Sequence, residues 1–205
     1  ASQWFKELFI PDNPKLYNYD LKASQANILL HELKYCKLKS QWLADYLDGK
    51  KPKSYYPDKI GIDVATWKDC FYALVMGAEV ENKFGAIYKS ILEYCNDDKK
   101  EAKKLWENFL DVTSELRVVV SEWRDYIYES SYNDKRYMYK HKVKRWQNAC
   151  GMKNKKYGII QNGKESELIL SDTGERITNK KKIKKLKRSM AAFILQGQEA
   201  CFIHN

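Results

Sequence analysis

The sequence predicts a helix-dominated α+β fold. Long segments carry apolar residues at a spacing of three and four, which is the period of an amphipathic helix. Strand-like alternation is confined to a short stretch near the N-terminus and to a pair of apolar runs around Asn162-Gly163, a dipeptide typical of hairpin turns. We therefore expect many helices and few strands.

The first half of the chain alternates between helices and turns. Residues 15–21 alternate in the manner of a strand, and Ser24 can cap a helix that runs to about Cys36. A short helix is expected over 41–47 and a loop over 50–61, which contains two prolines. Asp63 can cap the next helix, over 64–76, which Gly77 would end.

In the second half, one continuous helix is expected over residues 100–129, because its apolar positions keep the helical spacing throughout. Two strands, 157–160 and 168–170, are expected to pair as a hairpin. The last helix begins within the lysine run 180–188 and continues to about His204.

Composition narrows the partners and the location. The net charge of +10 favours a polyanionic partner such as nucleic acid. Five scattered cysteines without a CxxC pair, and only three histidines, argue against a zinc site and fit reduced thiols in an intracellular protein. No apolar run reaches about 18 residues, so we expect no membrane span.

Asp20 ends the predicted strand directly before a helix, a position from which a carboxylate can bind a metal ion. It can equally cap the following helix. Further along, Lys68, Tyr72 and Met76 share one helical face, where an ammonium group can bind phosphates and a ring can support a sugar or base. The alternative is an ordinary amphipathic helix with a solvated lysine.

The run 180–188 is the most basic segment and predicts contact with a phosphate backbone. A localisation signal or a solvated face would have the same composition. The basic and aromatic segment 132–145 favours nucleic acid.

Taken in order, these segments resemble the DNA polymerase I family (family A). Residues 4–10 and 19–29 are similar to its motif A, written D-Y-S-Q-I-E after an upstream R-x-x-F element, and 64–78 to its motif B, R-x-x-x-K-x-x-x-[FY]-x-x-x-Y-G. The segment 105–123 looks like the fingers helix that ends V-R-x-W. Residues 188–200 look like the helix written R-A-A-x-N-x-P-I-Q-G-T-A-A-D.

The resemblance implies a role for each matching residue. Asp20 would bind Mg²⁺ together with the backbone carbonyl of Leu21, and Gln25 would stand at the steric gate against ribonucleotides. Lys68 would bind the triphosphate and Tyr72 the sugar. The implied nucleotide site also includes Met76 and Gly77, and the implied primer–template contacts are Lys184, Lys185, Lys187, Arg188, Gln196 and Gly197.

The implied architecture is part of a polymerase palm sheet with helical fingers. Residues 1–48 would form a palm segment with motif A, 49–155 the fingers helices with motif B, and 156–205 a hairpin and basic helix that return to the palm. Val64, Met76 and Ala192 depart from the family pattern, where an arginine, a tyrosine and an asparagine stand.

The resemblance implies a template-directed DNA polymerase that adds dNTPs to a DNA primer–template. The family's second catalytic aspartate would follow residue 205, so we expect this chain alone to be inert and to need a further segment or partner subunit. Two alternatives remain. One is a single-subunit RNA polymerase of the phage and mitochondrial type, in which glycine stands at position 25, and the other is a non-catalytic nucleic-acid-binding module.

Overall fold

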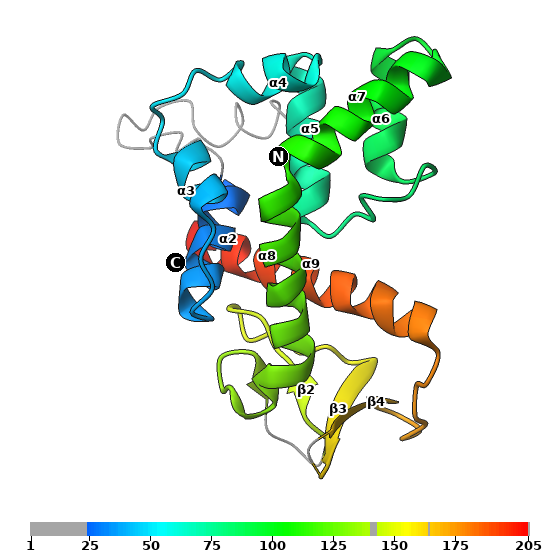
Figure 1. Ribbon diagram of the computed structural model, residues 1–205. Coiled ribbons are helices and arrows are strands. Elements are labelled where there is room, and N and C mark those ends of the chain that lie inside the picture. Colours follow the sequence, from blue (N-terminus) through cyan, green and yellow to red (C-terminus); the bar gives the residue numbers. More distant parts are fainter. Residues whose placement is uncertain (1–23, 140–142, 164, 205) are drawn as a thin grey trace, which may run out of the picture.

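The computed structural model describes residues 24–139, 143–163 and 165–204, which are mainly helical (Figure 1). The helices are α2 (Ser24–Tyr35), α3 (Gln41–Leu47), α4 (Tyr55–Ile60), α5 (Val64–Val75), α6 (Ala86–Tyr94), α7 (Lys99–Val112), α8 (Ser114–Asp125) and α9 (Lys180–His204). A π-helical turn (Tyr126–Ser130) and a 3₁₀ turn (Ser131–Asn133) follow α8. The strands are β1 (Met138–Tyr139), β2 (Arg145–Trp146), β3 (Tyr157–Asn162) and β4 (Glu165–Leu170).

The described strands form two antiparallel pairs, β1 with β2 and β3 with β4, so the helix-dominated α+β class is confirmed. The palm sheet and the fingers remain predictions, and the strand expected over 15–21 lies outside the described residues. None of the described helices is both long and apolar enough to span a bilayer.

Helices α2, α3 and α5 lie where the sequence predicts them. α3 has the expected bounds, and α5 begins after Asp63, whose side chain accepts a hydrogen bond of 2.7 Å from the Thr66 amide. Gly77 follows α5 with a φ of +97°, a conformation that glycine adopts at little cost. Local capping chemistry therefore sets the boundaries of α5.

The expected loop over 50–61 is wrong, because it contains α4. Its Pro57 lies in the first turn of the helix, where backbone amides have no intrahelical partner and a proline removes nothing. Gly61 ends α4 with a φ of +94° and donates a 2.8 Å hydrogen bond to the Pro57 carbonyl. Pro57 is therefore compatible with a helix at this position, although prolines elsewhere in a helix break it.

The single helix expected over 100–129 is also wrong, because it breaks at Thr113 into α7 and α8 (Figure 1). Thr113 is buried, and its hydroxyl donates a 2.7 Å hydrogen bond to the Phe109 carbonyl. Such back-bonding by threonine bends helices. The apolar spacing continues across the break, which is why periodicity alone did not reveal it.

The hairpin is confirmed, with Asn162 opposite Glu165 and Gly163 at a φ of +63°. Helix α6 was not expected, although Ile87 and Ile91 are both buried one turn apart. The short β1–β2 pair was not expected either, since two-residue strands carry no readable period.

The core beneath α5 is aromatic. Trp67 and Phe71 of α5 stack on each other at 5.5 Å between ring centroids, and Trp67 also stacks on Tyr56 of α4 at 5.7 Å. Trp42 of α3 completes the cluster and donates a 2.8 Å hydrogen bond to the Val112 carbonyl at the end of α7. These contacts fix α5 against α3, α4 and α7, whereas Lys68, on another face of α5, stays exposed.

Helix α9 runs across the described part of the molecule and contacts both α2 and α8 (Figure 1). Its apolar side, which includes Leu186, Met190, Ile194 and Leu195, is buried. Gly197 is buried too, and a Cβ atom there would overlap with the side chain of Asn148. A glycine is therefore required where α9 passes this loop.

Candidate nucleotide-binding site

Three residues of the predicted nucleotide site line one cavity of about 440 Å³ between α2, α5 and α9. Gln25 comes from the first turn of α2, and Tyr72 and Met76 come from the end of α5. Ala73 and Glu199 complete the lining. Residues from the two segments that resemble motifs A and B are thus neighbours in space.

The position of these side chains follows from how α5 is buried. Its other side carries Trp67, Cys70, Phe71, Leu74 and Val75, all buried in the core. A helix with that side buried must present positions 68, 72 and 76 on the opposite side. The order and spacing of apolar residues in the sequence therefore determine which side chains reach the cavity.

Lys68 lies one helical turn before Tyr72 on the same face. Its side chain is exposed, and it is not among the residues that line the cavity. An exposed ammonium at this distance can reach a charged group of a ligand that extends out of the cavity. Lys68 therefore lies on the helical face that carries Tyr72, outside the lining of the cavity.

Gln25 and Glu199 bring polar groups to the cavity. Its Nε2 donates a hydrogen bond of 3.3 Å to the Glu199 carboxylate, while its Oε1 is buried and has no hydrogen-bond partner among the described residues. A buried acceptor without a partner costs free energy, so a donor from a ligand would be favoured there. A sugar hydroxyl has the required chemistry.

A buried carboxylate fixes α2 against α9 below the cavity. Glu32 is fully buried and accepts hydrogen bonds from Arg136, from the Tyr137 hydroxyl and, at 2.8 Å, from Gln198 of α9. Burial raises the pKa of Glu32, and the hydrogen bond from Tyr137 and the charge of Arg136 oppose that rise. This network holds Gln25 and Glu199 on facing helices.

Gly77, predicted in the nucleotide site, and Arg188, predicted as a primer–template contact, lie against each other. A Cβ on Gly77 would lie 3.0 Å from the Arg188 carbonyl oxygen and 3.2 Å from its Cβ. Gly77 does not line the cavity, so its contribution is to let the end of α5 approach α9.

Three of the predicted primer–template residues of α9 form ion pairs, which divide between different carboxylates. Arg188 lies 3.1 Å from the Glu79 carboxylate and Lys184 lies 3.7 Å from it, whereas Lys187 pairs with Asp125 and Glu129 at 2.8 Å each. The charge of Arg188 lowers the pKa of Glu79.

The other α9 residues of this group are separated further. Lys185 and Gln196 are exposed, and Gly197 is buried against Asn148. The structure therefore brings Lys184, Lys187 and Arg188 to the lining of one cavity between α8 and α9, and leaves the other three predicted contacts outside it.

The predicted magnesium ligands Asp20 and Leu21 lie outside the described residues. Within residues 24–139, 143–163 and 165–204, no group of three or more histidine, cysteine, aspartate or glutamate side chains could hold a metal ion. The magnesium prediction therefore stays untested.

Two residues of the site were missed from the sequence. Glu199 lies three residues after Gln196 on the same helix, and its role depends on a partner far away in the chain. Glu32 did carry a signal, because it falls between Leu29 and Leu33 on the apolar side of α2, where a charge needs a partner.

Comparison of the chain with known protein-family models, curated proteins and solved structures found no match. The polymerase resemblance thus depends on the residues and the geometry described above.

Proposed function

We propose that this chain is part of a template-directed DNA polymerase and binds a deoxynucleoside triphosphate at the cavity between α2, α5 and α9. The observation that carries the proposal is the convergence of Gln25, Tyr72 and Met76 on this cavity. Gln25 precedes Tyr72 by 47 positions along the chain, and the three residues were expected together only from the resemblance. Their meeting supports a common ligand.

In this proposal the sugar lies against the Tyr72 ring and Gln25 occupies the space that a 2′-hydroxyl would need. Lys68, exposed one turn before Tyr72 on the same face of α5, holds the triphosphate. Asp20 and the Leu21 carbonyl would hold Mg²⁺, which assists nucleotidyl transfer by stabilising the attacking and leaving oxygens. A further segment or subunit would supply the second carboxylate.

Calorimetric titration of the chain with dATP and Mg²⁺ tests the nucleotide site. Lys68→Ala is expected to weaken dATP binding about tenfold or more, because a charge-assisted hydrogen bond is lost. Lys89→Ala is the matched control, since Lys89 is also an exposed helical lysine but lies on α6, away from the cavity. Equal affinities of the two variants, or no dATP binding by the wild-type chain, would contradict the proposal.

The same titration separates the DNA and RNA polymerase alternatives. A DNA enzyme should bind dATP more tightly than ATP, and Gln25→Gly should narrow that difference because the space for a 2′-hydroxyl opens. Tighter binding of ATP by the wild-type chain would favour the RNA polymerase.

A non-catalytic nucleic-acid-binding module is the second candidate. Helix α5 begins with the neutral Val64, where the family has a phosphate-binding arginine. This candidate predicts nucleic-acid affinity without any binding of dATP, so the titration separates it from the polymerase.

A further inference from the structure

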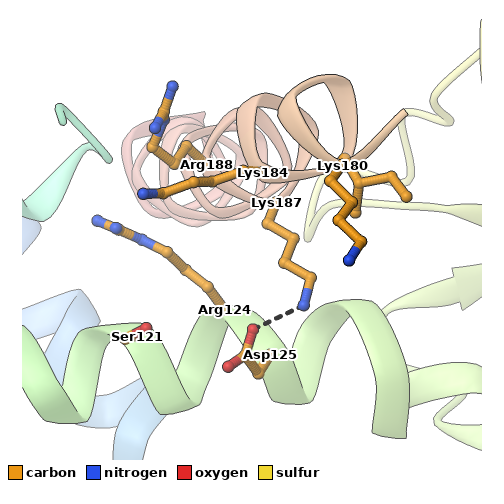
Figure 2. A pocket seen from close by; sticks show the side chains of 8 residues that line it. Ser121, Arg124, Asp125, Lys180, Lys184, Lys187 and Arg188 are labelled. Carbon is orange, nitrogen blue, oxygen red and sulfur yellow. Dashed lines mark hydrogen bonds and ion pairs between the residues drawn. The ribbon is translucent and has the colours of Figure 1, made fainter. Parts of the chain in front are cut away.

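A basic groove lies between α8 and α9, on a different part of the molecule from the nucleotide cavity (Figure 2). It consists of two adjoining cavities of about 330 and 370 Å³, which share the lining residues Ser121, Arg124, Lys184 and Arg188. Six cationic side chains line the two cavities: Arg117, Arg124, Lys180, Lys184, Lys187 and Arg188. The carboxylates in the lining are Glu79, Glu81 and Asp125, so positive charge is in excess.

Arg124 is the most informative of these cations. It projects from α8 toward Lys184 and Arg188 on α9 (Figure 2). Its Nη2 donates a 3.0 Å hydrogen bond to the Leu74 carbonyl, its Nε has no hydrogen-bond partner, and no carboxylate lies within ion-pair distance of it among the described residues. Burial and the charge of Arg188 lower the pKa of Arg124 to about 10.

Holding Arg124 and Arg188 close together without a carboxylate between them costs free energy. The neighbouring acids do not relieve it, because Asp125 pairs with Lys187, and Glu79 is shared by Lys184 and Arg188. An anion between the two helices would remove the repulsion and satisfy the free guanidinium donors.

The groove is longer than a single phosphate requires. Lys180, Lys184 and Arg188 recur every four residues along α9, and eight residues of helix rise about 12 Å. Phosphates of one strand in a duplex follow each other at about 3.4 Å along the helix axis and lie further apart along an unstacked single strand, so the row can accompany more than one of them.

An exposed aromatic residue follows the groove-lining segment 79–81 by three positions. Phe84 is 84% exposed, which is unusual for a large apolar side chain. It precedes Gly85, and a Cβ on Gly85 would lie 2.8 Å from the carbonyl oxygen of Glu79, a groove-lining residue. A basic groove next to an exposed ring is the combination that single-stranded nucleic acid uses, because its bases have free faces for stacking.

The geometry points to the α8/α9 groove as a binding site for the phosphodiester backbone of a single-stranded nucleic acid, with Arg124, Lys184 and Arg188 contacting one phosphate. The inference rests on the proposed function for the identity of the ligand, and adds Arg124 and Ser121 of α8 to the residues that face it. In the polymerase, this strand would be the unpaired template.

Fluorescence anisotropy with a labelled 20-nucleotide oligothymidine tests the inference on the full chain, without nucleotide or metal. The variant K180Q/K184Q removes two exposed lysines that line the groove, and K181Q/K182Q removes two exposed lysines of the same helix that do not. Both variants lose the same charge. A matched melting temperature confirms that each is folded.

K180Q/K184Q is expected to reduce the slope of log Kd against log salt concentration by about 1.4, or about 0.7 for each lost phosphate contact. This change corresponds to about 25-fold weaker binding at 0.1 M salt. K181Q/K182Q should change the affinity less than about threefold, because charges outside the groove are screened. Ser121→Glu should weaken binding as well, whereas Ser189→Glu, at an exposed α9 position outside the lining, should not.

Equal losses in the two lysine variants would overturn the inference, because binding would then depend on overall charge. Tighter binding of a 20-base-pair duplex than of the oligothymidine would overturn the single-stranded ligand. Lys68→Ala should leave oligothymidine binding unchanged, so a failure of the nucleotide site and a failure of the groove can be told apart.

Discussion

The contact between Gly77 and Arg188 yields a stability prediction that can be worked out from three glycines. Gly77 has a φ of +97°, and a Cβ there would lie 3.0 Å from a backbone oxygen of α9. Gly61 has nearly the same φ, +94°, but its Cβ would meet only the end of the Leu105 side chain, at 3.1 Å. Gly49 has a φ of +73° with nothing within 4 Å. The three positions separate backbone strain from crowding.

Alanine at any of the three positions costs about 1–2 kcal/mol, because a Cβ is strained at positive φ. At Gly49 nothing is added. At Gly61 the leucine side chain can rotate away, whereas at Gly77 the obstacle is the backbone of a packed helix, which adds about 1–2 kcal/mol of crowding. The expected order of destabilisation is Gly77→Ala, then Gly61→Ala, then Gly49→Ala.

Urea denaturation followed by circular dichroism measures the three free energies of unfolding, with unchanged m-values as the check that the denatured state is comparable. A loss at Gly77 no larger than the loss at Gly61 would refute the close approach of Gly77, at the end of α5, to α9. In that case the nucleotide cavity, whose walls include these two helices, would lose part of its geometric basis.

Two further predictions concern α9. Gly197→Ala should destabilise the protein by about 1–2 kcal/mol although alanine favours helices, because its Cβ would overlap with Asn148. In an Asn148→Gly background the same change should be neutral or stabilising. A loss of equal size in both backgrounds would contradict the overlap. Burial raises the pKa of Glu32 above its usual 4.5, so the folded protein holds this proton more tightly than the unfolded chain. Stability from this group is therefore lost as pH rises above 4.5. The unfolding free energy of the wild type minus that of Glu32→Gln should fall from about pH 4 to pH 7, and a rise over this range would contradict the raised pKa.

The elements that could be predicted from the sequence are those with a local cause. Asp63 caps α5 through a hydrogen bond to a residue three positions away, and Gly163 supports a hairpin between adjacent strands. Chemistry within a few residues decides such features, so the sequence displays them directly.

The features that could not be predicted depend on contacts across the chain or on competition between local effects. Thr113 interrupts a helix whose apolar spacing continues unchanged, and Pro57 is harmless because of its place in the first turn of α4. Arg124 belongs to no basic run in the sequence, and only the packing of α8 on α9 brings it beside Arg188. The part that Arg124 plays in the groove therefore could not be predicted from the sequence, whereas the lysine run of α9 could be read from it directly.

This distinction also decides which substitutions can test function. Gly77 and Gly197 match polymerase motifs, yet each has a packing reason to be glycine, so a loss of activity on substitution would say little about chemistry. Lys68, Lys180 and Lys184 are exposed, and removing them disturbs no core contact. A specific loss of nucleotide or nucleic-acid binding at these lysines, with stability unchanged, can only arise from the ligand. Substitutions at the exposed lysines therefore test ligand binding, and substitutions at the packed glycines test how the helices around the sites are positioned.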